Sequence, residues 1–534
     1  MSDSPRADAS YLKFKLAFIA LFLIFIFNVA YDYHWVNVDT TPPAWDQSNH
    51  LIKSLDYYYW LTQESPIIIF SYVYFYPPLY PLSTSFFYMI FGTSPDSGIM
   101  VNSIYLAILI FSVYGIGNRM FDNKTGVIAV LLVSLFPAVS NLQREFLIDF
   151  ALISMVSLTI YCLIACDFFR NRNYSLLFGI AFALSMLTKW TAFLFIAGPL
   201  IYIVIRIFFN SNKFENKSKQ KMNFIYSLIL SFALSGIWYL PNFNLIYNMV
   251  LMRTQSIGAY ESDPEIFTAQ SLLYYFFANI NYVSIIFFII FIAGLMVLFK
   301  KRSSNAIPLY LIIAVPYLAF TLIRNKDLRY MAPAVISISI IGAASISSIK
   351  NKKLFTAAII LISLFGIFQL FPHEFGIKSI NFETSYGTLY LIGPEARGPI
   401  IQDWKVKDVT MDIFNDSKHS DRIIMKGSGY LGVIPDMPYL NGLTYEHYIY
   451  SNKLPFFAIN CVYLDFNEFS LNIYNFDYII VRSAENEGSP NNKAADDMRK
   501  YFYDNKGDKF ILLKQYELPD NTTLFTYKNI IAIS

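Results

Sequence analysis

The chain has 534 residues, of which 55% are hydrophobic and only 15% are charged. Soluble domains carry about 25% charged residues, so this composition, with its repeated long apolar runs, predicts a polytopic membrane protein. A net charge of +3 argues against a nucleic-acid partner, and three scattered cysteines argue against a disulfide framework or a cysteine-based metal site.

The apolar runs predict a mainly α-helical membrane domain. The first run, Tyr11 to Val29, is long enough to cross a bilayer and lacks a small-residue cleavage site, so we expect an uncleaved first span. Runs of about 20 mostly apolar residues predict about eleven spans in all, at 12–31, 98–117, 125–141, 147–167, 175–188, 191–208, 224–243, 273–299, 306–323, 330–348 and 355–371. The run 79–91 is too short to span, so it should lie along the surface or re-enter.

The basic loops predict the orientation of these spans, because Lys and Arg gather on the cytoplasmic side. With alternating spans, the basic groups that fall on one side are those around residues 6–15, 119–124, 170–172, 213–221, 300–302 and 350–353. The opposite, outer face then holds the first loop, 32–97, the loops 142–146, 244–272 and 324–329, the turn at Lys189 and everything after residue 372. We therefore expect a protein of the cytoplasmic membrane whose outer face carries the polar loops.

The composition changes at about residue 372, where polar residues and turn signals become frequent. Short β-like runs occur at 422–424 and 478–482, and the best helical pattern lies at 491–504. We expect two domains: a transmembrane domain, 1–371, and a soluble extracytoplasmic α/β domain, 372–534.

The first outer loop holds candidate catalytic groups. Asp46, His50 and Lys53 lie at helical spacing, so they share one face of a predicted short helix that begins after two prolines. Asp46 beside Trp45 suits a general base, although an acid at this position could equally cap the helix. The sequence requires no cofactor. Asn37-Val38-Asp39 approximates a DxD metal signature, so Asp39 and His50 are candidate contacts for a divalent ion or for an acceptor.

Four further charged residues fall at the predicted outer ends of spans. Asp149 begins a span, where it is either a functional acid or an acid favoured by the helix N-terminus and by Arg144. Lys189 lies in LTKWTA between two apolar half-spans, where it either reaches the interface or binds a lipid phosphate. Arg329 offers the same choice. Arg253, in the outer loop 244–272, is a weaker candidate for binding a lipid phosphate, and its alternative is a solvated loop charge.

Taken together, these residues carry a resemblance to a known family. The order is Asp46, then PPLYP at 77–81, Arg144-x4-Asp149, LTKW at 187–190, and KDLRYxxP at 326–333. This order resembles the C-type membrane glycosyltransferases, in the branch of the protein mannosyltransferase-like enzymes and the lipid A aminoarabinose transferase. The resemblance covers residues from about 10 to 350.

That resemblance implies transfer of a sugar from a polyprenyl-phosphate carrier to a lipid, glycan or protein acceptor on the outer face, with inversion. It implies Asp46 as the base, Asp149 as a second acid, and Lys189, Arg253 and Arg329 as contacts to the carrier phosphate. Two departures stand out: Gln47 replaces the family's second loop acid, and Tyr76 stands where the family often has a basic or histidine residue.

Two other functions are also compatible with parts of this sequence. A transporter or flippase of lipid-linked sugars would also place charges in membrane helices, but no inverted repeat is visible and the acids lie at the outer ends. An oligosaccharyltransferase of the same superfamily usually has a WWDYG-like signature in its outer domain. The nearest candidate, residues 402–405, reads QDWK and does not match.

Overall fold

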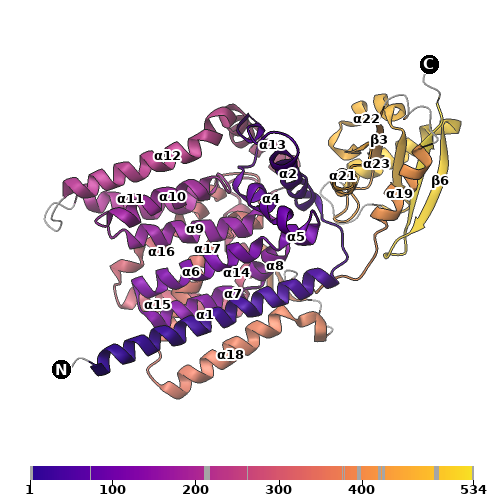
Figure 1. The fold of residues 1–534 in the computed structure, drawn as a ribbon. Coiled ribbons are helices and arrows are strands. Elements are labelled where there is room, and N and C mark those ends of the chain that lie inside the picture. Colours follow the sequence, from indigo (N-terminus) through magenta and orange to yellow (C-terminus); the bar gives the residue numbers. More distant parts are fainter. Residues whose placement is uncertain are drawn as a thin grey trace. The chain divides into compact units, whose positions relative to one another are not determined.

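The computed structural model describes residues 4–71, 74–209, 217–260, 263–375, 377, 379–393, 398–418, 423, 427–485 and 492–531. The chain forms two compact units (Figure 1). The helical unit comprises residues 1–35, 65–83 and 99–398, and the α/β unit comprises 36–64, 84–98 and 399–534. The second unit therefore takes in parts of the first outer loop, whereas residues 372–398, which precede it, group with the helices.

The helical unit corresponds to the predicted spans. Its long helices are α1 (Ser4–Val38), α6 (Asn102–Met120), α7 (Asn123–Leu135), α8 (Pro137–Arg144), α9 (Ile148–Ala165), α10 (Arg172–Met186), α11 (Ala192–Phe209), α12 (Lys217–Tyr247), α14 (Ala269–Val283), α15 (Ile285–Lys300), α16 (Ile307–Thr321), α17 (Ala334–Ser347) and α18 (Lys352–Leu370). Shorter pieces are α3 (Ile68–Ser71), the π-helical segment Asn248–Arg253, α13 (Thr254–Tyr260), and 3-10 turns at Ser304–Ala306, Leu328–Met331 and Pro372–Phe375. Each of the eleven predicted segments is a helix or a pair of helices.

Two predicted spans are bent pairs. The segment 125–141 becomes α7 and α8, which meet at 63°, and 273–299 becomes α14 and α15, which meet at 109°. Pro137 explains the first bend, because a proline begins a helix readily but cannot continue one. At the second, Ser284 has φ 71°, which ends one helix and begins the next. Within the described residues six single helices, or eight spans with the two pairs, are long and apolar enough to cross a membrane.

The helices pack around α9. The apolar window of α9 is 89% buried, whereas those of α1, α12 and α18 are 22–28% buried. Glycines allow the closest crossings: a Cβ at Gly294 of α15 would lie 2.0 Å from the carbonyl oxygen of Ile341 in α17. Small residues at such crossings let backbones approach, as is typical of helices packed in membranes.

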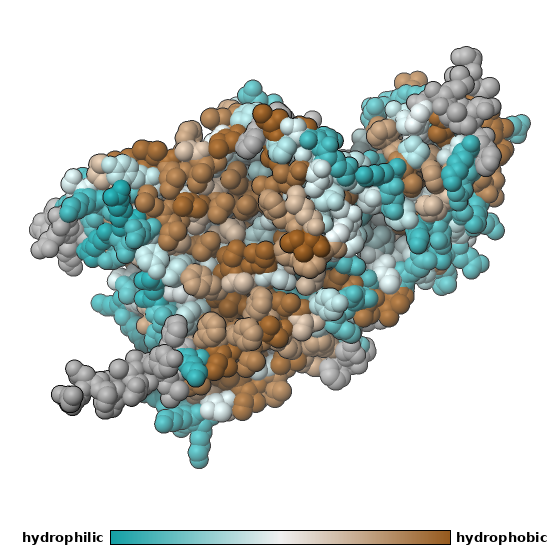
Figure 2. All heavy atoms as spheres, viewed as in Figure 1, coloured by the Kyte–Doolittle hydropathy of each residue, from teal (hydrophilic) through white to brown (hydrophobic). Residues whose placement is uncertain are grey.

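The outer surface of the helical unit is apolar. Figure 2 shows hydrophobic residues spread along its helices and hydrophilic residues gathered towards their ends. The exposed side chains include Phe232 and Leu240 on α12 and Leu361 and Leu364 on α18. Such a surface suits lipid and not water.

Two smaller elements complete the description of these segments. The run at residues 79–91, which is too short to span, forms a 13-residue helix, α4 (Leu79–Phe91). A hairpin of β1 (Ile380–Thr384) and β2 (Gly387–Ile392) packs on α14.

The α/β unit is built on a five-stranded sheet in the order β4-β3-β5-β7-β6. The strands are β3 (Gly429–Val433), β4 (Phe456–Asn460), β5 (Tyr478–Arg482), β6 (Phe510–Glu517) and β7 (Thr523–Asn529). β3 pairs in parallel with β4 and β5, and β7 pairs antiparallel with β5 and β6. Its helices are α2 (Trp45–Thr62), α5 (Pro95–Ile99), α19 (Val406–Ser417), α21 (Gly442–Ser451), α22 (Phe466–Asn472) and α23 (Asn492–Asn505).

Helices cover both faces of this sheet. On β5, Tyr478 and Ile480 join the core formed with α19 and α21, whereas Ile479 and Val481 join the core formed with α22 and α23. Successive strand residues point to opposite faces, so one strand serves two cores. The predicted α/β class is thus confirmed, as are the strand at 478–482 and the helix near 491–504. The predicted run 422–424 lies almost wholly outside the described residues.

Candidate active site

Asp149 lies at the start of the most buried helix. The chain leaves α8 at Glu145 and passes through Leu147 in an extended conformation, so α9 begins at Ile148 and places Asp149 in its first turn. A carboxylate there interacts favourably with the helix N-terminus. Its side chain is only 1% exposed, and a buried carboxylate requires compensating charge.

Lys189 supplies that charge from the turn that follows α10. Its Nζ donates to Asp149 Oδ1 at 2.8 Å. The side chain is also nearly buried, and its ammonium lies 5.7 Å from the centre of the Tyr330 ring. The predicted second acid and the predicted LTKW lysine are therefore direct partners.

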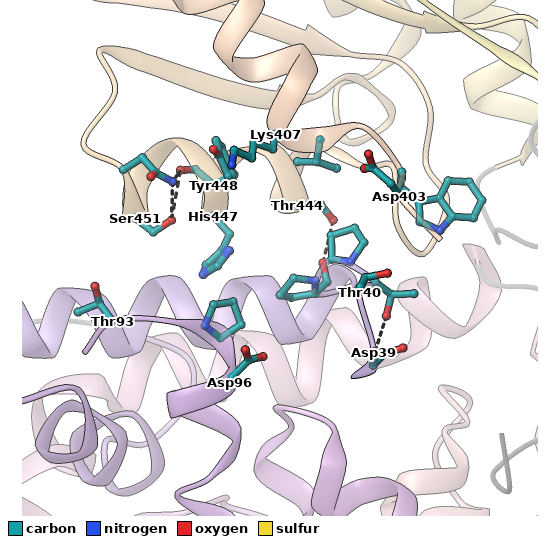
Figure 3. Close-up of a pocket in the computed structure, with 17 residues that line it drawn as sticks. Asp39, Thr40, Thr93, Asp96, Asp403, Lys407, Thr444, His447, Tyr448 and Ser451 are labelled. Atoms are coloured by element: carbon teal, nitrogen blue, oxygen red, sulfur yellow. Dashed lines mark hydrogen bonds between the residues drawn. The ribbon is translucent and has the colours of Figure 1, made fainter. Parts of the chain in front are cut away.

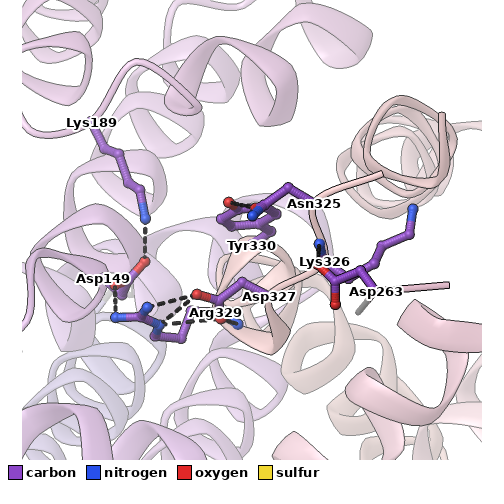
Figure 4. A network of polar contacts seen from close by, with 8 residues as sticks. All are labelled: Asp149, Lys189, Asp263, Asn325, Lys326, Asp327, Arg329 and Tyr330. Carbon is purple, nitrogen blue, oxygen red and sulfur yellow. Dashed lines mark hydrogen bonds and ion pairs between the residues drawn. The ribbon is translucent and has the colours of Figure 1, made fainter. Parts of the chain in front are cut away.

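Arg329 approaches the same carboxylate from the 3-10 turn Leu328–Met331. Its Nη1 lies 4.0 Å from Asp149 Oδ2, and its Nη2 lies 2.6 Å from Asp327 Oδ2. Asp327 also accepts from Arg329 Nε, at 2.9 Å, and from the Arg329 backbone N–H, so the acid fixes both the turn and the guanidinium (Figure 4). The Arg329 side chain remains 31% exposed.

These four side chains form what we call the Asp149 cluster: Asp149, Lys189, Asp327 and Arg329. Two acids balance two cations, which is how buried charges are tolerated. The guanidinium of Arg329 holds the pKa of Asp327 below its usual range, although burial acts in the opposite direction. Arg329 is the most exposed member of the cluster.

The neighbouring cations of the same loop serve other roles. Lys326 Nζ donates to the carbonyl oxygens of Phe320 and Thr321 at 2.9 and 3.0 Å, and also to that of Ile323. It therefore closes the C-terminal end of α16, where carbonyls have no partner within the helix. Arg324 Nη2 lies 3.9 Å from Glu265.

The PPLYP and LTKW motifs are joined through their backbones. The backbone N–H of Leu79 donates to the carbonyl oxygen of Leu187 at 2.9 Å, two residues before Lys189. The following tyrosine, Tyr80, is buried and donates to Asn102 at 3.1 Å. The hydrogen bond from Leu79 to Leu187 gives the PPLYP motif a structural role, because it fixes the turn that carries Lys189.

A second buried polar group lies where α1 meets α8, and we call it the Asp32 network. Asp32 accepts from Gln143 Nε2, and Arg144 Nη1 donates to the Tyr31 hydroxyl at 2.8 Å. Tyr31 donates in turn to the Leu370 carbonyl oxygen at the end of α18, at 2.9 Å. Arg144 also lies over the rings of Tyr31 and Trp35. These contacts direct Arg144 towards α1, in place of the predicted role beside Asp149.

The remaining predicted residues fall elsewhere. Asp46 is half-buried in the first turn of α2, and His50 is buried one turn later, so the predicted short helix exists. Both belong to the α/β unit, as does Asp39, whose oxygens accept from the Ile400 backbone N–H at 2.7 Å and the Thr41 hydroxyl at 2.6 Å. Arg253 ends the π-helical segment, and its side chain lies outside the described residues.

The metal prediction finds no assembled ligand set in the described part of the chain. No group of three or more His, Cys, Asp or Glu side chains there is arranged to hold a metal ion. Asp39 directs its oxygens to hydrogen-bond donors of the protein. A divalent ion therefore stays a prediction from the sequence alone.

Comparison with known proteins agrees with this architecture. Residues 76–239 match the family model described as dolichyl-phosphate-mannose-protein mannosyltransferase. An uncharacterized protein of Aquifex aeolicus is 24% identical over 362 residues, which cover 66% of this chain and 67% of that protein.

Solved structures show the same fold over nearly the whole chain. ArnT from Cupriavidus metallidurans in the apo state has a TM-score of 0.60 at 11% identity and covers 98% of both chains. The same protein bound to undecaprenyl phosphate has a TM-score of 0.57 at 11% identity, covering 94% of this chain and 97% of that one. The oligosaccharyltransferase AglB from Archaeoglobus fulgidus, in complex with an inhibitory peptide and a dolichol-phosphate, has a TM-score of 0.56 at 13% identity, with 98% and 75% covered.

The chain is therefore an integral membrane protein with the fold of the C-type glycosyltransferases. Within that class, the resemblance to the protein mannosyltransferase-like and ArnT-like branch is confirmed.

Proposed function

We propose that this protein transfers a sugar from a polyprenyl-phosphate carrier to an acceptor at the outer face of the cytoplasmic membrane, with inversion. The single observation that carries the proposal is the Asp149 cluster: a buried acid with two cations, at the start of a central helix in a C-type glycosyltransferase fold. Intramembrane ionisable groups are costly, so they are retained for function more often than for stability.

The chemistry follows from the charges. The acceptor oxygen or nitrogen attacks the anomeric carbon, and the bond from that carbon to the phosphate oxygen breaks with its electron pair leaving on the phosphate. Lys189 and Arg329 compensate the charge that grows on the departing polyprenyl phosphate, and preorganised cations are effective at this. Asp46 accepts the proton that the acceptor loses, as a general base within reach of the attacking atom does.

Asp149 and Asp327 keep the two cations in place before the donor arrives. A phosphate that reaches Arg329 competes with Asp327 for the same planar fork of N–H donors, which suits both anions. Exchange between two such partners allows the carrier to bind and, after transfer, to leave. The donor lipid carries the activated sugar itself, so no nucleotide is needed.

The experiment that tests this proposal uses the full chain in lipid nanodiscs with a panel of radiolabelled polyprenyl-phosphate sugars and an extract of cell-envelope glycans, lipids and proteins. We expect label to pass from one donor into one acceptor class. Asp46→Asn should reduce transfer to background without changing the folded fraction, and Glu64→Gln, an exposed acid in the same loop, should not. Wild-type turnover by Asp46→Asn would overturn the assignment of the base.

The rival readings give different products in the same experiment. A flippase moves the intact lipid-linked sugar between leaflets of a sealed vesicle and breaks no bond at the anomeric carbon. An oligosaccharyltransferase moves a preassembled oligosaccharide to a peptide. Recovery of free polyprenyl phosphate together with a singly glycosylated acceptor favours the proposal over both.

A further inference from the structure

The α/β unit contains a cavity of about 510 Å³ that the mechanism above does not use. Its lining comes from the segment between α1 and α2, the start of α5, the segment leading into α19, and the outward face of α21 (Figure 3). All of these residues belong to the α/β unit. The volume lies within the range of about 300–1,000 Å³ that is typical of small-ligand sites.

Hydrogen bonds hold the walls of this cavity in place. The Thr40 backbone N–H donates to the Ile400 carbonyl oxygen at 2.9 Å, and the Ile400 N–H donates to Asp39 Oδ1. The Thr444 hydroxyl of α21 donates to the Pro43 carbonyl oxygen at 2.9 Å. Three segments far apart in the sequence are thus fixed to one another before any ligand binds.

One buried side chain in this cavity lacks a partner. His447 of α21 is only 5% exposed and lines the cavity, yet it makes no hydrogen bond with any described residue. Burial lowers the pKa of His447 to about 4, so the imidazole is neutral at pH 7, with one nitrogen a donor and the other an acceptor. A ligand hydroxyl in the cavity could therefore donate to this ring or accept from it.

The opposite side of the cavity offers an exposed carboxylate, that of Asp96. Figure 3 shows the imidazole of His447 directed towards the side where Thr93 and Asp96 lie. Asp96 likewise forms no hydrogen bond or ion pair with any described residue. A neutral donor–acceptor ring and a carboxylate therefore face one space from two walls.

The other lining groups define the chemistry of the occupant. Three carboxylates, those of Asp39, Asp96 and Asp403, line the cavity. Asp403 is paired with Lys405 at 2.6 Å, which leaves two carboxylates against the cation of Lys407. This excess of negative charge repels phosphate and carboxylate groups. Hydroxyl, amide and apolar ring groups complete the walls, among them Thr93, Tyr448, Asn452, Pro95 and Trp404. A sugar presents matching hydroxyls at its rim and C–H groups on its faces.

A peptide fits these walls less well. Extended peptides are usually recognised by adding a strand to an open edge or by apolar side-chain pockets. Here the backbone groups of Thr40 and Ile400 already pair with the protein. The hydroxyls of Thr41 and Thr444 and the amide N–H of Asn452 also donate to protein oxygens, but hydroxyl and amide oxygens can still accept from a ligand hydroxyl.

We propose that this cavity binds the acceptor of the transfer reaction and that the acceptor is a phosphate-free carbohydrate, recognised by His447 and Asp96. The inference rests on the proposed function and adds the class of acceptor to it. Both residues are binding residues for the acceptor, with no part in contacts to the donor phosphate.

The test measures transfer by the full chain in nanodiscs with a polyprenyl-phosphate sugar donor and three acceptor probes: a glucosamine trimer, an N-acetylglucosamine trimer and mannose 6-phosphate. We expect at least one trimer to accept label and the phosphorylated sugar neither to accept nor to compete. His447→Gln and Asp96→Asn should each raise the acceptor KM about tenfold, the usual effect of one lost hydrogen bond in a binding site, while the donor KM stays unchanged. The matched controls are His34→Gln and Asp504→Asn, both exposed.

The two proposals fail in different ways. Unchanged acceptor KM in both cavity variants, or preferred transfer to mannose 6-phosphate or to a serine-containing peptide, overturns the carbohydrate site while leaving glycosyl transfer intact. Absence of transfer with every donor and acceptor overturns the proposed function. In that case, binding of either trimer to the full chain by isothermal titration calorimetry, weakened in His447→Gln, still supports the cavity as a carbohydrate site, and no binding of either trimer refutes it.

Discussion

Two buried carboxylates of the helical unit have contrasting surroundings. Asp149 pairs with Lys189 and approaches Arg329, whose side chain is 31% exposed. Asp32 lies with Gln143 and Arg144, and the arginine is among the most deeply buried side chains of the protein. The first arrangement includes a cation that is partly exposed, whereas both Asp32 and Arg144 in the second are buried. We therefore expect a buried cluster of charged groups to be a reaction site only where one of its charges stays accessible.

The largest effect is expected from Lys189→Met, which tests the open half of this comparison. Loss of one cation beside the leaving phosphate should reduce turnover about a hundredfold or more. Asp149 would keep only the more distant Arg329, at 4.0 Å, so the loss of its direct partner should also cost about 3 kcal/mol of unfolding free energy. Initial rates and thermal unfolding in detergent measure the two effects.

The control is Lys300→Met, an exposed lysine at the end of α15. Adding Asp149→Asn to Lys189→Met should restore most of the stability and none of the turnover. Wild-type turnover in Lys189→Met would mean that the Asp149 cluster is as purely structural as the Asp32 network.

The Asp32 network is tested by Arg144→Met. The substitution removes the charged hydrogen bond that joins α8 to α1, so we expect a stability loss of about 3 kcal/mol. The molecules that stay folded should keep the wild-type donor KM. Arg170→Met, which breaks only an exposed ion pair, should change stability by less than about 1 kcal/mol. A changed donor KM in folded Arg144→Met would place this network in the reaction site.

A third variant, Asp327→Asn, tests how the stability contributed by the Asp149 cluster depends on pH. Asp327 has a pKa below its usual range because of Arg329, so the unfolded chain takes up this proton first as the pH falls. Its contribution to stability is present above the ordinary Asp pKa and is lost as the pH falls through the lowered value. We expect Asp327→Asn to cost about 2 kcal/mol at neutral pH, as a charged hydrogen bond does.

Thermal unfolding between pH 7 and pH 3 measures that response. The wild type should lose stability on acidification more steeply than Asp327→Asn. Equal slopes in the two proteins would show that Arg329 does not hold Asp327 ionised.

The smallest effect is expected from Tyr31→Phe, which removes one hydroxyl from the closed network. This hydroxyl links Arg144 to the Leu370 carbonyl oxygen, and its loss should cost about 1 kcal/mol. Chemical unfolding in detergent can resolve this difference against Tyr226→Phe, an exposed tyrosine on α12. An effect larger than that of Arg144→Met would mean that the tyrosine, and not the arginine, holds α1 to α8.

The sequence predicted much of this fold because hydropathy alone marks lipid-facing helices. All eleven segments and the short helix at residues 79–91 correspond to helices. The break at Pro137 had a visible signal in its proline, whereas the bend at Ser284 had none, because a serine with positive φ is set by tertiary contacts. The grouping of residues 36–64 with the α/β sheet could not be predicted, since it depends on contacts between residues hundreds of positions apart.

The candidate site was predicted unevenly. Motif order brought out Asp149, Lys189 and Arg329, which the structure places together, and their roles in catalysis stay predictions. Asp327 was missed because a single acid among basic residues resembles any charged loop, although its position two residues before Arg329 suits a tight turn. Asp32 was missed as well, and an acid in the last turns of a first apolar run was the signal that could have found it.

The bond between the Leu79 N–H and the Leu187 carbonyl has a consequence for how such a protein can diverge. It joins the backbones of two segments, so it does not depend on which side chains stand at residues 79 and 187. Substitutions there can leave the turn that carries Lys189 in place. Only a proline at residue 79 would abolish the donor, and two prolines already stand immediately before it. A Leu79→Pro substitution would therefore remove the hydrogen bond that joins the two turns, whereas other substitutions at residue 79 would keep the backbone donor.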